Sequence, residues 1–83
     1  MKKIAYSKAS IKTLRRLSAT EAKRIVAKIE QYADDPTSLT NNVKALVGSP
    51  YIRLRVGNWR VIMDDDGHIL EIIPIGPRGS VYQ

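Results

Sequence analysis

The chain has 83 residues, no cysteine and one histidine, and its formal net charge is +6. A chain this short forms one domain with a thin core, since small domains bury only about 60% of the surface that they expose when unfolded. The lack of cysteine excludes disulfides and thiolate nucleophiles, and one histidine excludes a multi-histidine metal site. The excess of Lys and Arg favours an anionic partner. We expect a single domain over 1–83 with neither metal nor cofactor.

The N-terminus predicts neither secretion nor membrane insertion. Only three apolar residues follow Met1-Lys2-Lys3 before the polar Ser7-Lys8 pair, so the apolar segment of a signal peptide is missing. No apolar run reaches the roughly 20 residues that a membrane-spanning helix needs. We therefore expect a cytoplasmic protein that binds no membrane.

The first half of the chain predicts one strand and two helices. Residues 2–6 alternate loosely in hydropathy, as a short strand does. Ser7 can cap a short helix, and Ser18 with Glu21 forms a capping box for a longer one that ends before Pro36. Apolar residues of the longer helix repeat at helical spacing and predict its buried face. They are Ala22, Ile25, Val26, Ile29, Tyr32 and Ala33.

The second half changes to the two-residue period of strands. Residues 37–50 have no clear period and predict a loop. Residues 51–56 and 59–63 alternate on either side of Gly57-Asn58, a pair that predicts a hairpin with a type II′ turn.

A second turn at Asp66-Gly67 leads to a last strand over residues 68–75, with Leu70 and Ile72 directed to the core. The order of elements is then β-α-α-β-β-β. It predicts an α+β domain in which two N-terminal helices pack on a mainly antiparallel sheet of four strands.

The hairpin register separates an apolar face from a basic face. If the turn has two residues, six apolar side chains share the core face. They are Ile52, Leu54, Val56, Trp59, Val61 and Met63. The outer face then carries Tyr51, Arg53, Arg55, Arg60 and Ile62, and the second and third of these arginines lie opposite each other. Like charges in a cross-strand pair cost about 0.2–1 kcal/mol, so we infer that this face binds an anion.

The distribution of charge supports a nucleic-acid ligand. No acidic residue occurs from residue 36 to residue 63, a segment that also contains Lys44. Arg78 and Tyr82 follow the last strand, and Arg binds phosphate in a bidentate way while Tyr stacks on bases. The competing interpretation of exposed arginines is simple solubility. The basic residues between positions 8 and 28 are typical of a solvated helical face.

At this point the chain resembles the RelE/ParE superfamily of bacterial toxins from toxin–antitoxin pairs. The resemblance rests on the order of elements, on the hairpin Tyr-Ile-Arg-Leu-Arg-Val-Gly-Asn-Trp-Arg-Val-Ile, and on the tail. RelE-type members are endoribonucleases that cut messenger RNA in the ribosomal A site, whereas ParE-type members inhibit DNA gyrase. The tail is more similar to the RelE type, through Gly76, Arg78, Val81 and Tyr82.

The resemblance implies a role for each matching residue. Arg53 matches a basic strand residue that acts near the nucleophilic 2′-hydroxyl, and Arg60 matches the phosphate-binding arginine. Arg78 matches the residue that assists the leaving 5′-oxygen, and Tyr82 matches the aromatic residue that stacks on the substrate base. Further RNA or phosphate contacts are expected from Lys44, Tyr51 and Arg55.

The implied reaction is attack of a ribose 2′-hydroxyl on the adjacent phosphate, which leaves a 2′,3′-cyclic phosphate and a 5′-hydroxyl. A guanidinium is a poor base because its pKa exceeds about 12. Lys44, Arg53 and a ribosomal group are therefore all open as proton acceptor. The tail departs from the family at Pro77, Gly79 and Gln83, where relatives commonly have basic residues.

The implied partners are a cognate antitoxin, the ribosome and mRNA, with operator DNA contacted only through the antitoxin complex. A ribosome-dependent ribonuclease toxin that inhibits translation is the first hypothesis. A ParE-like gyrase inhibitor and a catalytically silent nucleic-acid or antitoxin-binding member are the alternatives. We expect the antitoxin to cover the arginine face, where Ile62, Ile73 and Ile75 would form an apolar strip.

Overall fold

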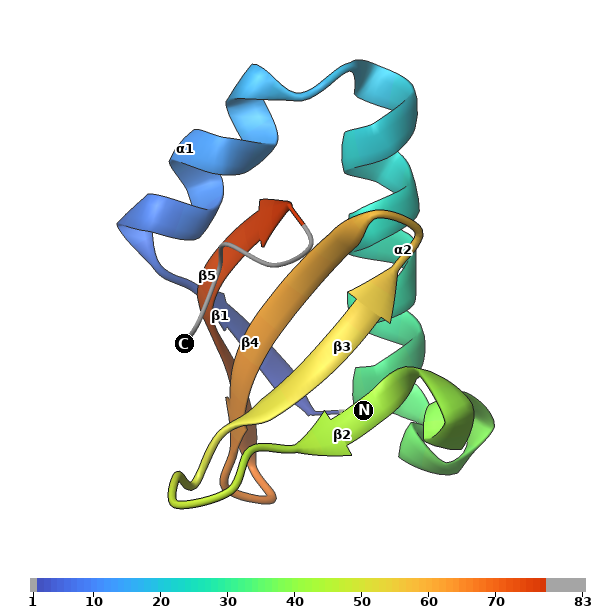
Figure 1. Ribbon diagram of the computed structural model, residues 1–83, viewed down its shortest axis with the longest axis vertical. Coiled ribbons are helices and arrows are strands. Elements are labelled where there is room, and N and C mark those ends of the chain that lie inside the picture. The colour runs from blue at the N-terminus through green and yellow to red at the C-terminus, as the bar shows by residue number, and fades with distance from the viewer. Residues whose placement is uncertain (1, 78–83) are drawn as a thin grey trace.

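The computed structural model describes residues 2–77, which form one mixed sheet and its helices (Figure 1). In chain order the elements are β1 (Lys3–Tyr6), α1 (Lys8–Arg16), α2 (Ala19–Asp34), the 3-10 helix η1 (Pro36–Asn42), β2 (Val43–Ala45), β3 (Ile52–Val56), β4 (Trp59–Asp65) and β5 (Ile69–Pro77). The predicted α+β class is confirmed. None of the helices within this part of the chain is long and apolar enough to cross a membrane.

The sheet has five strands in the order β1-β5-β4-β3-β2. Strand β1 pairs with β5 in parallel, and the other three neighbouring pairs are antiparallel, so the mainly antiparallel prediction is confirmed. The predicted number of four strands is wrong. The additional strand β2 lies within residues 37–50, where three strand residues are too few to produce a readable period.

The hairpin of β3 and β4 has the predicted register. Leu54 pairs with Val61, and Val56 pairs with Trp59 on either side of the two-residue turn. Gly57 has a φ of +60°. In the described part of the chain only glycines have a positive φ, so the φ of Asn58 is negative. A type I′ turn needs positive φ at both central residues, so this turn is of type II′, as predicted.

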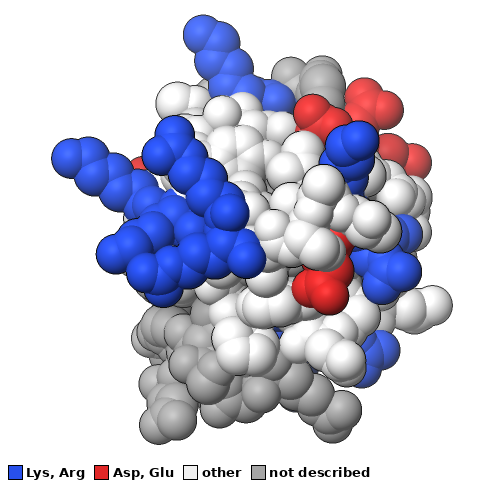
Figure 2. All heavy atoms as spheres, turned by 90° about the horizontal axis from the view of Figure 1, so that it is seen from above, with Lys and Arg blue, Asp and Glu red and all other residues white. Residues whose placement is uncertain are grey.

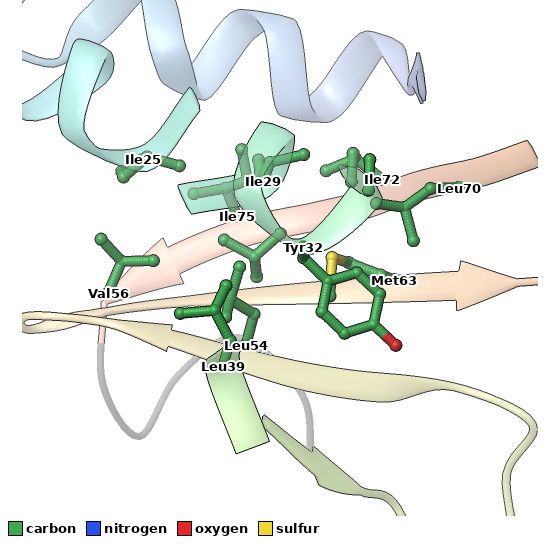
Figure 3. Close-up of a cluster of buried hydrophobic side chains, with 12 residues drawn as sticks. Ile25, Ile29, Tyr32, Leu39, Leu54, Val56, Met63, Leu70, Ile72 and Ile75 are labelled. Carbon is green, nitrogen blue, oxygen red and sulfur yellow. The ribbon is translucent and has the colours of Figure 1, made fainter. Parts of the chain in front are cut away.

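The core lies between α2 and one face of the sheet (Figure 3). Helix α2 buries four residues of its predicted apolar stripe there: Ile25, Ile29, Tyr32 and Ala33. From the sheet, the predicted hairpin residues Leu54, Val56, Val61 and Met63 are buried, and Ile52 and Trp59 are partly buried against them. Each fully buried aliphatic side chain contributes about 1.5–3 kcal/mol, so this layer provides most of the stabilisation.

A bulge in β5 changes which side chains enter the core. Between Val61 and Met63 the register with β5 shifts by one residue, next to Pro74, which lacks the amide proton that a ladder needs. The shift directs Ile75 into the core, where it is only 5% exposed. Ile62 is on the outer face but fully buried. The expected exposed apolar strip on the outer face is therefore wrong.

Two serines attach α1 to this bulge. Ser7 caps the helix as predicted, because its Oγ accepts a hydrogen bond from the Ser10 amide at 3.1 Å. The fully buried Ser10 donates to the carbonyl of Ile73 at 2.8 Å and contacts that of Ile72 at 3.2 Å. Ser7 Oγ also donates to the carbonyl of Ile73. The carbonyls of Ile72 and Ile73 in the bulge thus accept hydrogen bonds from the two serine hydroxyls at the start of α1.

The start of α2 is attached to β4. Ser18 Oγ accepts a hydrogen bond from the Glu21 amide at 3.2 Å, which confirms the predicted N-cap. The Glu21 carboxylate accepts a hydrogen bond of 2.7 Å from Trp59 Nε1. One acidic side chain thus links the first turn of the helix to the first residue of the strand.

An ion pair and a hydrogen bond meet at Asp65, the last residue of β4. Lys2 Nζ lies 2.7 Å from Asp65 Oδ2, and Tyr32 donates a longer hydrogen bond of 3.4 Å to the same oxygen. Burial alone would raise the pKa of Asp65, but hydrogen bonds from Lys2 and the Gly67 amide bring it below its usual value. Burial, together with the Asp65 charge, raises the pKa of Tyr32.

Candidate nucleic-acid interface

A basic pocket opens on the outer face of the sheet, where the end of η1 meets β2, β3 and β4. Its volume is about 260 Å³. The described residues that line it are Asn41, Asn42, Val43, Lys44, Arg53, Arg55 and Arg60. Four of the seven are cations and none is acidic, so the pocket attracts anions.

The pairing of the strands brings the four cations together. Lys44 on β2 is the cross-strand partner of Arg53 on β3, and Arg55 on β3 is the partner of Arg60 on β4. Each like-charged pair costs about 0.2–1 kcal/mol, and the sheet contains two of them side by side. An anion bound across both pairs would remove this repulsion.

One hydrogen bond from a side chain to the backbone joins two walls of the pocket. Asn42 Nδ2 lies 3.4 Å from the backbone carbonyl of Arg55 and links the end of η1 to β3. Lys44 and Arg55 are exposed, whereas Arg53 and Arg60 are half-buried. Half-buried side chains have fewer conformations open to them, and so lose less entropy when they bind an anion.

The chemistry available in the pocket is that of hydrogen-bond donors with positive charge. Guanidinium groups donate two parallel hydrogen bonds to a phosphate and remain protonated in proteins. The lining residues that the structure describes include neither a histidine nor a carboxylate. The pocket can therefore bind and orient a phosphodiester and stabilise negative charge on it.

The predicted site residues are brought together only in part. Lys44, Arg53, Arg55 and Arg60 all line the pocket. Tyr51 precedes β3 and is half-buried, but it does not line the pocket. The remaining two, Arg78 and Tyr82, lie outside the described residues.

The sequence did not predict two polar residues of the lining, nor the apolar Val43 between them and Lys44. Asn41 and Asn42 belong to the last turn of η1, within a segment predicted to be a loop. Their side chains add amide donors and acceptors beside the cations. No hydropathy period points to them, although their position just before Lys44 in the sequence is a weak signal.

The acidic run at Asp64-Asp65-Asp66 belongs to a turn. Asp66 Oδ1 accepts hydrogen bonds from the amides of Ile69 and His68 at 2.7 and 2.8 Å, and these bonds lower the pKa of Asp66. Between residues 2 and 77 no group of three or more His, Cys, Asp or Glu side chains could hold a metal ion.

Comparison with known families shows to which family the chain belongs. The family model described as the ParE toxin of the type II toxin–antitoxin system, parDE, matches residues 4–82. The chain belongs to this toxin family. The resemblance to the RelE/ParE superfamily is thereby confirmed, and the toxin is one component of a type II toxin–antitoxin system.

Solved structures share the fold of this toxin at low sequence identity. The RelE–RelB complex of Pyrococcus horikoshii OT3 gives a TM-score of 0.78 at 22% identity, over 95% of this chain and 97% of that one. The RelB–RelE complex of Methanococcus jannaschii gives 0.73 at 25% identity, over 92% of both chains. The intact E. coli RelBE complex gives 0.70 at 21% identity, over 93% of this chain and 96% of that one. Comparison with curated protein sequences gives no significant match.

Proposed function

We propose that this toxin is an endoribonuclease that cleaves mRNA on the ribosome and so stops translation. The observation that supports the proposal is the basic pocket, where Lys44, Arg53, Arg55 and Arg60 line one cavity and none of the described lining residues is acidic. A phosphodiester under attack gains negative charge, and cations already aimed at it stabilise the transition state more than the ground state.

In the proposed reaction a ribose 2′-oxygen attacks the adjacent phosphorus and the bond from phosphorus to the 5′-oxygen breaks. The products are a 2′,3′-cyclic phosphate and a 5′-hydroxyl. The 2′-hydroxyl loses its proton as it attacks, and the leaving 5′-oxygen takes one up. The protein contributes mainly orientation of the attacking group and stabilisation of charge.

The proposed roles of the pocket residues are those that the resemblance implies. Arg53 lies next to the attacking 2′-hydroxyl and Arg60 holds the phosphate, while Arg55 contacts a flanking phosphate. Neither a guanidinium nor an ammonium group accepts a proton. Lys44 would therefore have to act as the neutral amine, and Arg53 would have to lose a proton first. A group of the ribosome is the third candidate acceptor.

Three further contacts are proposed for residues that are not among the described lining of the pocket. Tyr51 adds an RNA contact at the start of β3. Arg78 assists the leaving 5′-oxygen, and Tyr82 stacks on a base.

The proposed partners are an antitoxin, the ribosome and mRNA in the cytoplasm. An antitoxin partner is supported by the solved structures of similar fold, which are RelE–RelB complexes. Contact with operator DNA is assigned to the toxin–antitoxin complex and not to the toxin alone.

Pulse-labelling after induction tests the proposal. Methionine incorporation should fall before thymidine incorporation, and primer extension should detect new 5′ ends inside coding sequences. Arg60→Ala should slow cleavage by about 10²–10³-fold, the usual loss when a transition-state donor is removed. Arg24→Ala, on the exposed side of α2, is the matched control and should remain toxic. Thymidine incorporation falling first would contradict the proposal.

Inhibition of DNA gyrase is the second candidate function, because the family model that matches is that of ParE. Supercoiling of a relaxed plasmid by purified gyrase distinguishes the two. A gyrase inhibitor would stop supercoiling at near-stoichiometric toxin and would leave translation in a cell-free system intact, whereas the proposed ribonuclease would do the reverse.

A further inference from the structure

Helix α1 carries an unusual concentration of positive charge. Its nine residues include four cations and no acidic residue, whereas the sixteen residues of α2 include three cations and three acids. The cations of α1 are Lys8, Lys12, Arg15 and Arg16, and all four are exposed. Figure 2 shows a dense group of Lys and Arg side chains on the left, the side on which Figure 1 places α1.

The four cations lie on one face of the helix. Their spacing of four, three and one residues places them within about one third of the helix circumference, given 3.6 residues per turn. They occupy a stripe about 12 Å long, at 1.5 Å per residue. Ser10, which is fully buried and attached to β5, lies on the opposite face of α1. The stripe therefore points to solvent from a helix that is fixed in place.

Helix stability does not explain the stripe. Arg15 and Arg16 in the last turn interact favourably with the helix dipole, but Lys8 is in the first turn, where a cation is unfavourable. Pairs of like charge four residues apart, such as Lys8 with Lys12, each cost about 0.2–0.5 kcal/mol. Among the described residues, none of the four cations forms an ion pair. An external anion would offset this repulsion.

We propose that the stripe on α1 is a second nucleic-acid contact, which binds backbone phosphates of a folded RNA. The choice of RNA rests on the proposed ribonuclease function. The stripe and the basic pocket share no element, because the pocket is built from η1, β2, β3 and β4. One surface can thus hold a structured RNA while the other holds the strand to be cut.

The side chains around the stripe favour a phosphate backbone over an acidic protein segment. The apolar residues of α1 are not interleaved with the cations but turn into a groove of about 350 Å³ towards α2, which Ile11, Leu14 and Val26 line. Glu30 also lines that groove and would repel an acidic segment. Protein interfaces need apolar anchors among their charges, whereas a phosphate backbone needs only cations at suitable spacing.

Two variants with the same charge change test the proposal. In the first, K8Q, K12Q and R16Q are combined on α1, and Arg15 is kept because it also lines the groove. The control combines K23Q, K28Q and R24Q on α2, so that each variant removes two lysines and one arginine. Thermal melts followed by circular dichroism verify that both remain folded.

The probe is a fluorescein-labelled 2′-O-methyl RNA hairpin, which lacks the nucleophilic hydroxyl and cannot be cleaved. Its anisotropy is measured with free toxin from about 50 to about 200 mM salt. The α1 variant should bind about tenfold or more weakly, and its slope of log K against log salt should be shallower by about 2–3, at 0.7–0.9 per lost contact. The α2 variant should stay within about twofold of wild type.

Several results would overturn the inference. Equal weakening by both variants would mean that only net charge matters, and no weakening by the α1 variant would exclude the stripe. If the α1 substitutions weaken binding of a DNA hairpin of the same sequence more than binding of the RNA hairpin, RNA is excluded as the preferred ligand. If the α1 variant loses affinity for the antitoxin in calorimetry but not for RNA, the stripe is a protein contact.

Failure of the proposed function would be seen separately. A wild-type toxin that leaves mRNA uncut on ribosomes, but whose α1 variant still loses hairpin binding, would contradict the ribonuclease proposal and retain the second contact.

Discussion

Arg55 lies directly opposite Arg60 across the β3–β4 hairpin, in a cross-strand position where opposite charges are usually found. The turn that creates this pairing is fixed by Gly57, and the apolar residues on the other face fix the register. The repulsion between the two arginines is therefore a consequence of the same residues that build the core.

We predict that Arg55→Ala leaves the fold intact and stabilises it by about 0.2–1 kcal/mol, because Arg55 is exposed and faces a like charge. Urea denaturation measures the change. Arg24→Ala, also exposed, should change stability by less than about 0.5 kcal/mol. A loss of more than about 1 kcal/mol in the Arg55 variant would show that its side chain supports the hairpin.

Removing the Ser10 hydroxyl should destabilise the domain. Ser10→Ala leaves the buried contacts to the Ile72 and Ile73 carbonyls unmade, and an unsatisfied buried acceptor costs about 1–3 kcal/mol. Thr13→Ala is the control, because Thr13 makes an exposed hydrogen bond to Ala9 in the same helix. Similar melting temperatures for the two variants would mean that Ser7 alone satisfies the bulge.

Glu21→Ala should lower stability by about 1 kcal/mol. It removes the 2.7 Å bond from Trp59 Nε1 and the favourable acid in the first turn of α2. Asp34→Ala makes the same charge change at the opposite end of the helix, where an acid opposes the dipole, and should be neutral or stabilising. Equal losses in both variants would indicate a general effect of net charge.

Stability should fall in acid through Asp65. Its pKa is lower in the folded protein than the usual 3.8, so its contribution is complete above about pH 4 and is lost as pH falls through the folded value. Asp65→Asn should lower stability by about 0.5–1 kcal/mol at pH 7. It should also make the fall of stability with decreasing pH less steep. Melting temperatures from about pH 6 to about pH 3 measure this. Asp66, whose pKa is also lowered, will retain part of the slope.

The parts of the fold that the sequence predicted are those with strong periodicity or strong local chemistry. The register around Gly57 followed from apolar alternation on both strands, and the caps Ser7 and Ser18 followed from side-chain chemistry. The bulge next to Pro74 could not be placed by counting, because one inserted residue reverses the alternation and moves Ile75 into the core.

The basic pocket was predicted in part for the same reason. Arg53, Arg55 and Arg60 lie in strands of clear period, so their common face was readable. Lys44 was expected only as a loop contact, and its place beside Arg53 depends on a three-residue strand formed by long-range pairing. The roles of Arg78 and Tyr82 stay predictions.

The parallel pairing of β1 with β5 also affects how the chain acquires its structure. Lys3 in the first strand pairs with Ile69 in the last, so this strand pairing joins residues 66 positions apart. Contacts of such sequence separation slow folding, because the closure entropy is lost before the contact forms. Until β5 emerges, the nascent β1 has no partner in the sheet and remains an open edge available to other chains. The sheet is therefore complete only after the last of its strands has been synthesised.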